Sequence, residues 1–163
     1  MREKVFKILS KNDTGETGSH QSGMSIPKAV MERNIFPKLG TDVLNPRTTI
    51  EFFEDDNTKW VFQFIYYNDV FFGKPRNKAH NEYRLTCIGE LIKKHNIKSG
   101  DEIWFYVDEL GKRRVGFLKH QDSNANTITT KSTQEKIVCE PEAEYNPIGT
   151  ALKLSGKWRS VKL

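Results

Sequence analysis

The chain has little of what membrane proteins and disulfide-rich proteins carry. Only 2 of its 163 residues are cysteine, Cys87 and Cys139, and they form no CxxC pair, so neither a disulfide framework nor a zinc site of the usual spacing is indicated. The sequence opens without a basic-then-apolar leader, and no apolar run approaches the roughly 18 residues that span a bilayer. We therefore expect a reduced, cytoplasmic protein without a membrane partner.

Motifs for the common catalytic chemistries are also missing. The sequence contains no HExxH, GxSxG or GxxxxGK[ST], and its 4 histidines are dispersed without ligand spacing. Asp55, Asp56 and Lys59 come nearest to the set with which nucleases hold Mg²⁺ and activate water. Turn chemistry accounts for them, because they sit around a turn-rich tetrad between two strand patterns. We predict no catalytic residue and no metal site, with a small Mg-dependent nuclease as the alternative.

Composition instead indicates one folded domain with a polyanionic partner. Hydrophobic residues make up 36% and aromatic residues 11% of the chain, enough for a β-rich core in a single domain, 1–163. Lys and Arg number 26 against 21 Asp and Glu, a net charge of +5. A positive balance raises the prior for binding nucleic acid without settling it.

Period-two patterns predict that the fold is mainly β. In 59–68, aromatic residues occupy every second position from Trp60 to Tyr66. About seven short strands and two short helices, joined by hairpins, favour a closed or partly closed barrel over a parallel α/β sheet. The expected strands are 4–9, 48–54, 59–68, 83–86, 101–107, 112–120 and 157–163, with an extended segment at 23–26, weaker strand patterns at 127–130 and 137–139, and helices at 28–34 and 88–95.

Two polar excursions leave this barrel, and we call them the N-arm, about 10–23, and the C-arm, about 72–84. Residues 10–22 contain no aliphatic or aromatic side chain, so this run cannot contribute to a core. The C-arm is basic and carries one carboxylate, Glu82. Two arms on one barrel would form a clamp around a polar partner.

The C-arm side chains suit the edges of G·C base pairs. Arginine can hold guanine O6 and N7 together in the major groove, lysine does so less rigidly, and glutamate accepts from cytosine N4. A loop that only gripped phosphates would have little use for Glu82. The competing interpretation has Glu82 paired with Arg84 or Lys78 on a solvated loop, where such pairs contribute little.

The N-arm offers groups that donate to and accept from base edges, while its backbone N–H groups and Lys11 can take phosphates. The alternatives are that His20 is simply solvated and that Asn12 and Asp13 form turns that shape the arm. The full set predicted to contact DNA is Lys11, Asn12, Asp13, Ser19, His20, Gln21, Ser25, Lys74, Arg76, Asn77, Lys78, Glu82, Tyr83 and Arg84.

These residues lie in motifs that resemble the N-terminal DNA-binding domain of EcoRII-type restriction endonucleases. The motifs are Lys-Asn-Asp-Thr-Gly-x-Thr-Gly-x-His-Gln-x-Gly at 11–23, Ile26-Pro27, Phe36-Pro37, Leu44-Asn45-Pro46, Ile65-Tyr66-Tyr67-Asn68, Phe72-Gly73-Lys74-x-Arg76-Asn77 and Glu82-x-Arg84-Leu85-Thr86. They are collinear through residue 86. The sequence departs from the family by a short insertion, Lys78-Ala79-His80-Asn81, inside the C-arm motif.

The resemblance implies a DNA-binding pseudobarrel, a fold shared with a class of plant transcription factors, whose arms enclose duplex DNA from the major-groove side. It implies that the domain binds a CCWGG-like site as an effector or targeting module and does not cut. His20 falls on an N-arm recognition position, and Lys74, Arg76, Glu82 and Arg84 fall on C-arm positions. A covalently linked nuclease domain in a prokaryotic cytoplasm would then use Mg²⁺, and this domain would need no cofactor. A non-specific nucleic-acid binder remains a further alternative.

Overall fold

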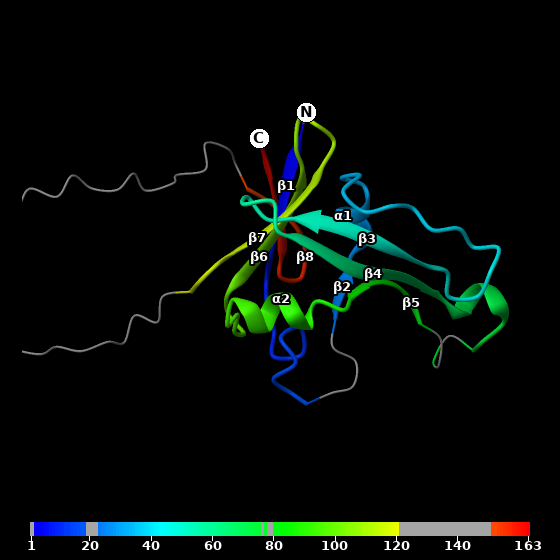
Figure 1. Ribbon diagram of the computed structural model, residues 1–163. Coiled ribbons are helices and arrows are strands. Elements are labelled where there is room, and N and C mark those ends of the chain that lie inside the picture. Colours follow the sequence, from blue (N-terminus) through cyan, green and yellow to red (C-terminus); the bar gives the residue numbers. More distant parts are fainter. Residues whose placement is uncertain (1, 19–22, 76, 78–79, 121–150) are drawn as a thin grey trace, which may run out of the picture.

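The computed structural model describes residues 2–18, 23–75, 77, 80–120 and 151–163, with the backbone alone at Ser155 (Figure 1). These residues form nine strands, two α-helices and one short 3₁₀ helix. The elements in chain order are β1 (Glu3–Ile8), β2 (Met24–Ile26), α1 (Lys28–Met31), β3 (Arg47–Phe53), β4 (Lys59–Asn68), η1 (Asp69–Phe72), β5 (Asn81–Thr86), α2 (Gly89–Lys94), β6 (Glu102–Val107), β7 (Arg113–Leu118), β8 (Leu152–Ser155) and β9 (Trp158–Lys162).

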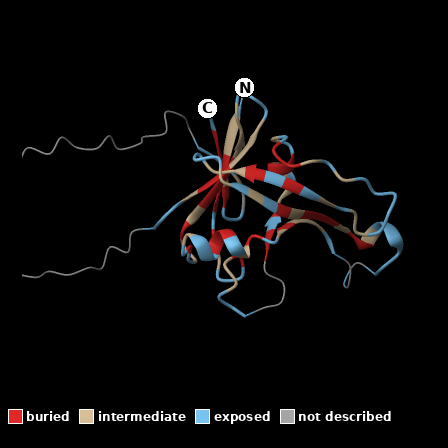
Figure 2. Ribbon diagram, in the orientation of Figure 1, coloured by how far each residue is buried: buried red, intermediate tan, exposed pale blue. Residues whose placement is uncertain are grey.

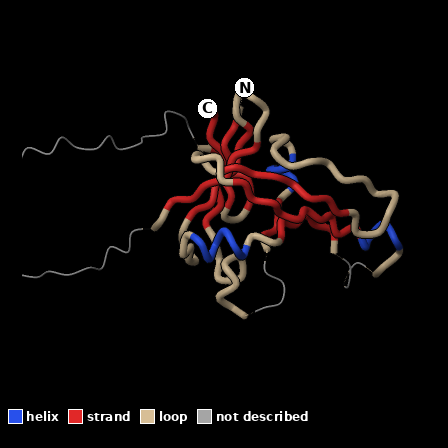
Figure 3. The backbone as a smooth tube through the Cα atoms, in the orientation of Figure 1, coloured by secondary structure: helices blue, strands red, loops and turns tan. Residues whose placement is uncertain are grey.

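All nine strands belong to one curled sheet in the order β2-β5-β4-β3-β7-β6-β1-β9-β8. Neighbouring strands are antiparallel except β3 and β7, which pair in parallel through Phe53 and Arg114 alone. That junction divides the sheet into β2-β5-β4-β3 and β7-β6-β1-β9-β8, and Figure 3 shows the strands converging where the two halves meet. Because β2 and β8 end the sheet without pairing to each other, the barrel is only partly closed.

The predicted fold class is therefore confirmed, with differences in detail. The sequence predicted about seven strands, and the described residues contain nine. The additional ones are β8, a four-residue strand too short to show a period, and β2, which was expected only as an extended segment. The weak strand patterns at 127–130 and 137–139 lie outside the described residues.

The core is built from aromatic side chains that alternate along the strands. Phe52, Phe62, Phe64 and Phe105 are among its largest fully buried side chains. Phe36 joins the two halves, since its ring centroid lies 5.3 Å from that of Phe64 and 5.5 Å from that of Phe105. Figure 2 shows the buried positions recurring along the long strands, as a sheet with one face on a core requires.

Two short helices cover parts of this core. The buried residues of α1 are Val30 and Met31, and those of α2 are Leu91 and Ile92. Each helix is followed within three residues by an asparagine in the left-handed conformation, Asn34 at φ 57° and Asn96 at φ 48°. Both helices therefore stop earlier than the predicted bounds, and no helix among the described residues is long and apolar enough to cross a bilayer.

The C-arm is shorter than predicted. Asn81–Thr86 pair residue for residue with Gln63–Asn68, so β5 begins at Asn81 and the loop ends there. Glu82 consequently joins Arg84 in the strand predicted at 83–86, and both residues lie in the sheet. The physical reason is that the free edge of β4 offers a continuous ladder of backbone hydrogen bonds, which a polar strand can take as well as an apolar one.

Candidate nucleic-acid interface

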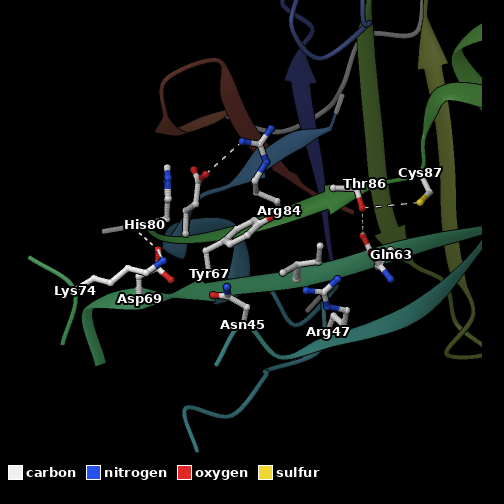
Figure 4. A pocket seen from close by; sticks show the side chains of 12 residues that line it. Asn45, Arg47, Gln63, Tyr67, Asp69, Lys74, His80, Arg84, Thr86 and Cys87 are labelled. Carbon is white, nitrogen blue, oxygen red and sulfur yellow. Dashed lines mark hydrogen bonds and ion pairs between the residues drawn. The ribbon is translucent and has the colours of Figure 1, made fainter. Parts of the chain in front are cut away.

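A hollow of about 580 Å³ lies over the outer face of β3, β4 and β5 (Figure 4). Side chains alternate across a strand, so Phe62 and Phe64 of β4 enter the core while Gln63, Ile65 and Tyr67 line the hollow. The lining residues are Asn45, Arg47, Gln63, Ile65, Tyr67, Asp69, Lys74, His80, Glu82, Arg84, Thr86 and Cys87.

One register row places two arginines on this face. Ile65 of β4 lies opposite Arg47 of β3 on one side and opposite Arg84 of β5 on the other. Arg84 in turn lies opposite Ser25 of β2. Since adjacent strands are separated by about 4.8 Å, the backbones at the two arginines are roughly 10 Å apart.

Arg84 and Glu82 are held together in the hollow. Arg84 Nη1 lies 3.4 Å from Glu82 Oε1, and Arg84 Nη2 donates to the Gly23 carbonyl oxygen at 3.3 Å. Ser25 Oγ donates to Glu82 Oε2 at 3.2 Å. The Arg84 side chain is 15% exposed and that of Glu82 33% exposed, so this is a partly buried arrangement on a rigid strand pair instead of an ion pair on a solvated loop.

A second ion pair lies at the end of the hollow where Figure 4 shows Asp69, Lys74 and His80 together. Lys74 Nζ lies 3.1 Å from Asp69 Oδ2, and the His80 backbone N–H donates to the same oxygen at 3.3 Å. Burial alone would raise the pKa of Asp69, but the hydrogen bonds from Lys74 and His80 outweigh it and set that pKa below its usual range. Asp69 is therefore ionised at neutral pH.

Buried Asn68 shapes the adjoining wall. Its side chain accepts from the Asn45 backbone N–H at 2.8 Å and donates to the Val43 carbonyl oxygen at 2.8 Å. Its own N–H donates to Asn45 Oδ1 at 3.2 Å. These contacts fix the segment that leads into β3 and so place Arg47 at its position in the hollow.

The hollow carries an excess of positive charge. Its two carboxylates, Asp69 and Glu82, each contact a cation, Lys74 and Arg84 respectively. Within the described part of the chain, the Arg47 side chain has no ion pair or hydrogen bond. An uncompensated arginine beside two neutralised pairs favours an anionic ligand.

Comparison with known proteins shows to which family the chain belongs. The family described as restriction endonuclease EcoRII, N-terminal, matches residues 3–100. The chain belongs to this family. The type II restriction enzyme EcoRII of Escherichia coli is 43% identical to it over 84 residues, which cover 50% of this chain and 20% of that enzyme. The chain thus spans about a fifth of the length of that relative.

A solved structure supports the fold of this EcoRII N-terminal family member. The Arabidopsis FUS3–DNA complex superposes with a TM-score of 0.52 over 70% of this chain and 94% of that one, at 23% identity. The pseudobarrel predicted from the motif resemblance is therefore confirmed, because the similarity covers most of both chains.

The family's sequence motifs and the hollow coincide only in part. Of the predicted DNA contacts, Lys74, Glu82 and Arg84 line the hollow, and Ser25 adjoins it through Glu82. Lys11, Asn12 and Asn77 are exposed, and none of them lines the hollow. Ser19, His20, Gln21, Arg76 and Lys78 lie outside the described residues, as does Ala79 of the insertion.

Two of the predicted DNA contacts have a structural role in this fold. Asp13 is only 4% exposed and is bonded to Lys7 and Ser10, so its turn-forming alternative holds. Tyr83 stacks on Tyr66 with a centroid distance of 4.2 Å and on Phe64 at 5.6 Å, on the face of β5 opposite to Glu82 and Arg84. In both cases a polar side chain near the predicted site is used to support the fold.

Sequence reasoning also missed residues that the hollow brings together. Gln63 and Tyr67 occupy the non-core positions of the strand predicted at 59–68, so the period-two pattern could have identified them. Arg47 could not be found in this way, because its place depends on the pairing of β3 with β4. Among the described residues, no group of three or more His, Cys, Asp or Glu could hold a metal ion.

Proposed function

We propose that this chain binds double-stranded DNA in a sequence-specific manner. The hollow, the N-arm and the C-arm face the major groove. The preferred site is a CCWGG-like sequence. The chain acts as the effector or targeting domain of a type II restriction endonuclease and does not cut by itself. A covalently linked nuclease domain in the prokaryotic cytoplasm binds Mg²⁺ and cuts the DNA.

The observation that carries this proposal is the Ser25, Glu82 and Arg84 group on the hollow's surface. Glutamate accepts from cytosine N4 and arginine donates to guanine O6 and N7, so the two side chains together match a C·G pair. Both side chains project from β5, which pairs with β2 and with β4 and so fixes their positions better than a loop would. Phosphate binding alone would not require a carboxylate, because a carboxylate is repelled by the phosphates of DNA.

Family membership supports the same proposal. The relative in E. coli is named as a type II restriction enzyme, and the FUS3 structure is a complex with DNA. The match to about a fifth of the restriction enzyme supports a separate catalytic region elsewhere in the longer protein.

A panel of duplexes that differ from a CCWGG-containing duplex by one base pair each tests the proposal. Fluorescence anisotropy at fixed salt gives a Kd for each duplex. We expect mismatches at the C·G pairs to weaken binding by about 1–3 kcal/mol each. Equal Kd values across the panel and for a random duplex would reject sequence-specific binding, and tighter binding to single strands would favour the non-specific alternative.

The nuclease alternative rests on Asp55, Asp56 and Lys59 at the β3–β4 hairpin tip. Asp56 Oδ1 accepts from the Thr58 backbone N–H at 2.8 Å, which is a turn contact. Incubation of the protein with plasmid and Mg²⁺ tests the alternative directly. Cleavage that is lost in Asp56→Asn would favour the nuclease and overturn the proposed division of labour.

A further inference from the structure

Asp69 joins the two ends of the C-arm loop. It is 2% exposed and begins η1, directly after β4. Its backbone N–H donates to the His80 carbonyl oxygen at 3.1 Å, and its Oδ2 accepts from the His80 N–H at 3.3 Å. Its carbonyl oxygen accepts from the Lys74 N–H at 3.3 Å. We call this set of contacts the neck of the C-arm.

The Asp69 carboxylate has Lys74 as its counter-ion. Lys74 Nζ lies 3.1 Å from Oδ2, and the Lys74 side chain is 54% exposed while that of Asp69 is 3% exposed. The other oxygen, Oδ1, is buried without a hydrogen-bond partner among the described residues. Lys74 is the only cation paired with Asp69 among the described residues, and a buried carboxylate that loses its counter-ion is strongly disfavoured, so Lys74 stays on Asp69.

This pairing leaves Lys74 able to contact a ligand at one fixed place. A lysine ammonium has three N–H donors, and Asp69 Oδ2 accepts one of them. The remaining donors can reach a phosphate or base acceptor in the hollow, which both residues line. A free lysine on a flexible stem would instead follow phosphates on any sequence.

We infer that Asp69 is a positioning residue that contributes to sequence discrimination. It acts through Lys74, whose ammonium it holds at the rim of the hollow, and through the neck that fixes where the C-arm leaves the sheet. The inference rests on the proposed function and adds to it a residue that does not itself contact DNA.

The consequence is a change in specificity that a purely structural role would not produce. Without the charge on Asp69, Lys74 becomes an unpaired cation. It then binds phosphates of any duplex, so random DNA is bound at least as tightly as before while the preferred site loses a fixed contact. If Asp69 served stability alone, its loss would weaken binding to all duplexes in the same proportion.

The test compares Asp69→Asn with Asp56→Asn. Both variants remove one negative charge, but Asp56 is exposed at the β3–β4 hairpin tip and does not line the hollow. Kd values are measured for the tightest duplex of the panel and for a random duplex of equal length. The specificity ratio is the Kd for the random duplex divided by the Kd for the preferred duplex. We expect this ratio to shrink at least tenfold in Asp69→Asn, with binding to the random duplex undiminished. In Asp56→Asn the ratio should stay unchanged.

Lys74→Gln and the double variant complete the test. The ratio should shrink in Lys74→Gln as well. The double variant should have a ratio no smaller than that of the less specific single variant, because both substitutions break the same Asp69–Lys74 pair. An unchanged ratio in Asp69→Asn, or additive losses in the double variant, overturns the inference. If circular dichroism shows Asp69→Asn unfolded, an unchanged ratio in Lys74→Gln overturns it. Lack of discrimination by the unaltered protein would reject the proposed function itself and is seen before any variant is made.

Discussion

Lys7 Nζ lies 2.6 Å from Asp13 Oδ1, with both side chains buried at the root of the N-arm. The second oxygen of Asp13 accepts from the Ser10 backbone N–H at 2.8 Å and from Ser10 Oγ at 2.7 Å. Lys7 belongs to β1, which pairs with both β6 and β9. The first turn of the arm is thus bonded to an interior strand of the sheet.

Replacing Asp13 by Ala should therefore destabilise the whole fold. The change leaves Lys7 as a buried cation without a partner, and breaking such a pair costs about 3–5 kcal/mol. Urea unfolding measures this as a fall in the free energy of unfolding. In Lys7→Met/Asp13→Ala no lone charge remains, so part of the loss should be recovered. A double variant less stable than Asp13→Ala would contradict this account.

The β3–β7 junction gives a prediction about pH. Arg114 Nε donates to Asp108 Oδ2 at 2.8 Å, and Arg114 Nη1 donates to the Glu54 carbonyl oxygen at 3.0 Å. The hydrogen bond from Arg114 is the largest influence on Asp108 and holds the pKa of that carboxyl below its usual value of 3.8. The ionised Asp108 therefore stabilises the fold fully at pH values above the usual pKa. This stabilisation is lost as the pH falls through the lowered pKa of the folded protein.

Asp108→Asn should consequently be less stable than the unaltered protein at pH 7, and the difference should shrink as the pH is lowered below about 3.8. Urea titrations at a series of pH values between 7 and 3 measure it. Glu109→Gln is the matched control, because Glu109 is an exposed neighbour that pairs with Arg2 and not with Arg114. A stability difference that is the same at every pH would rule out the ionised Asp108 as its source.

Much of the fold could be predicted from the sequence because strands show a period of two in their side chains. The aromatic alternation in 59–68 became β4, a ten-residue strand with the predicted bounds. The strand order could not be predicted, since a single parallel bridge between Phe53 and Arg114 joins the two halves. Nothing in the local sequence of either residue indicates a partner so distant in the chain.

The candidate site was predictable where motif and strand coincide. Glu82 and Arg84 were identified by residue type, and the pairing of β5 with β4 places both on one face. Asp13 and Tyr83 support the fold, a role that the sequence could not separate from DNA contact because only burial and packing reveal it. Arg47 was missed because its position depends on strand register.

Arg47→Ala should weaken binding to every duplex by a similar factor. Arg47 is exposed in the hollow and has no counter-ion among the described residues, so a phosphate is its expected partner. Loss of one phosphate contact should reduce the slope of log K against log salt by about 1. Anisotropy titrations at several salt concentrations measure both quantities. A loss confined to one base-pair position would instead assign Arg47 to base recognition.

Arg84→Ala should act on specificity, in contrast to Arg47→Ala. A bidentate arginine–guanine contact contributes about 1–3 kcal/mol of discrimination, so we expect the preferred duplex to be bound roughly tenfold to a hundredfold more weakly. Binding to a random duplex should change far less, because Arg84 already has Glu82 as its partner on the protein.

Arg84→Lys separates charge from geometry at the same position. Lysine keeps the positive charge but cannot present two parallel N–H groups to guanine, so Arg84→Lys should bind a random duplex as the unaltered protein does without restoring discrimination. The competition is measured with the preferred duplex against each single-base-pair variant, and the lost preference should fall on a C·G pair. If Arg84→Lys discriminates as well as the unaltered protein, the fixed guanidinium beside Glu82 is not what reads the base, and Arg84 contributes charge alone.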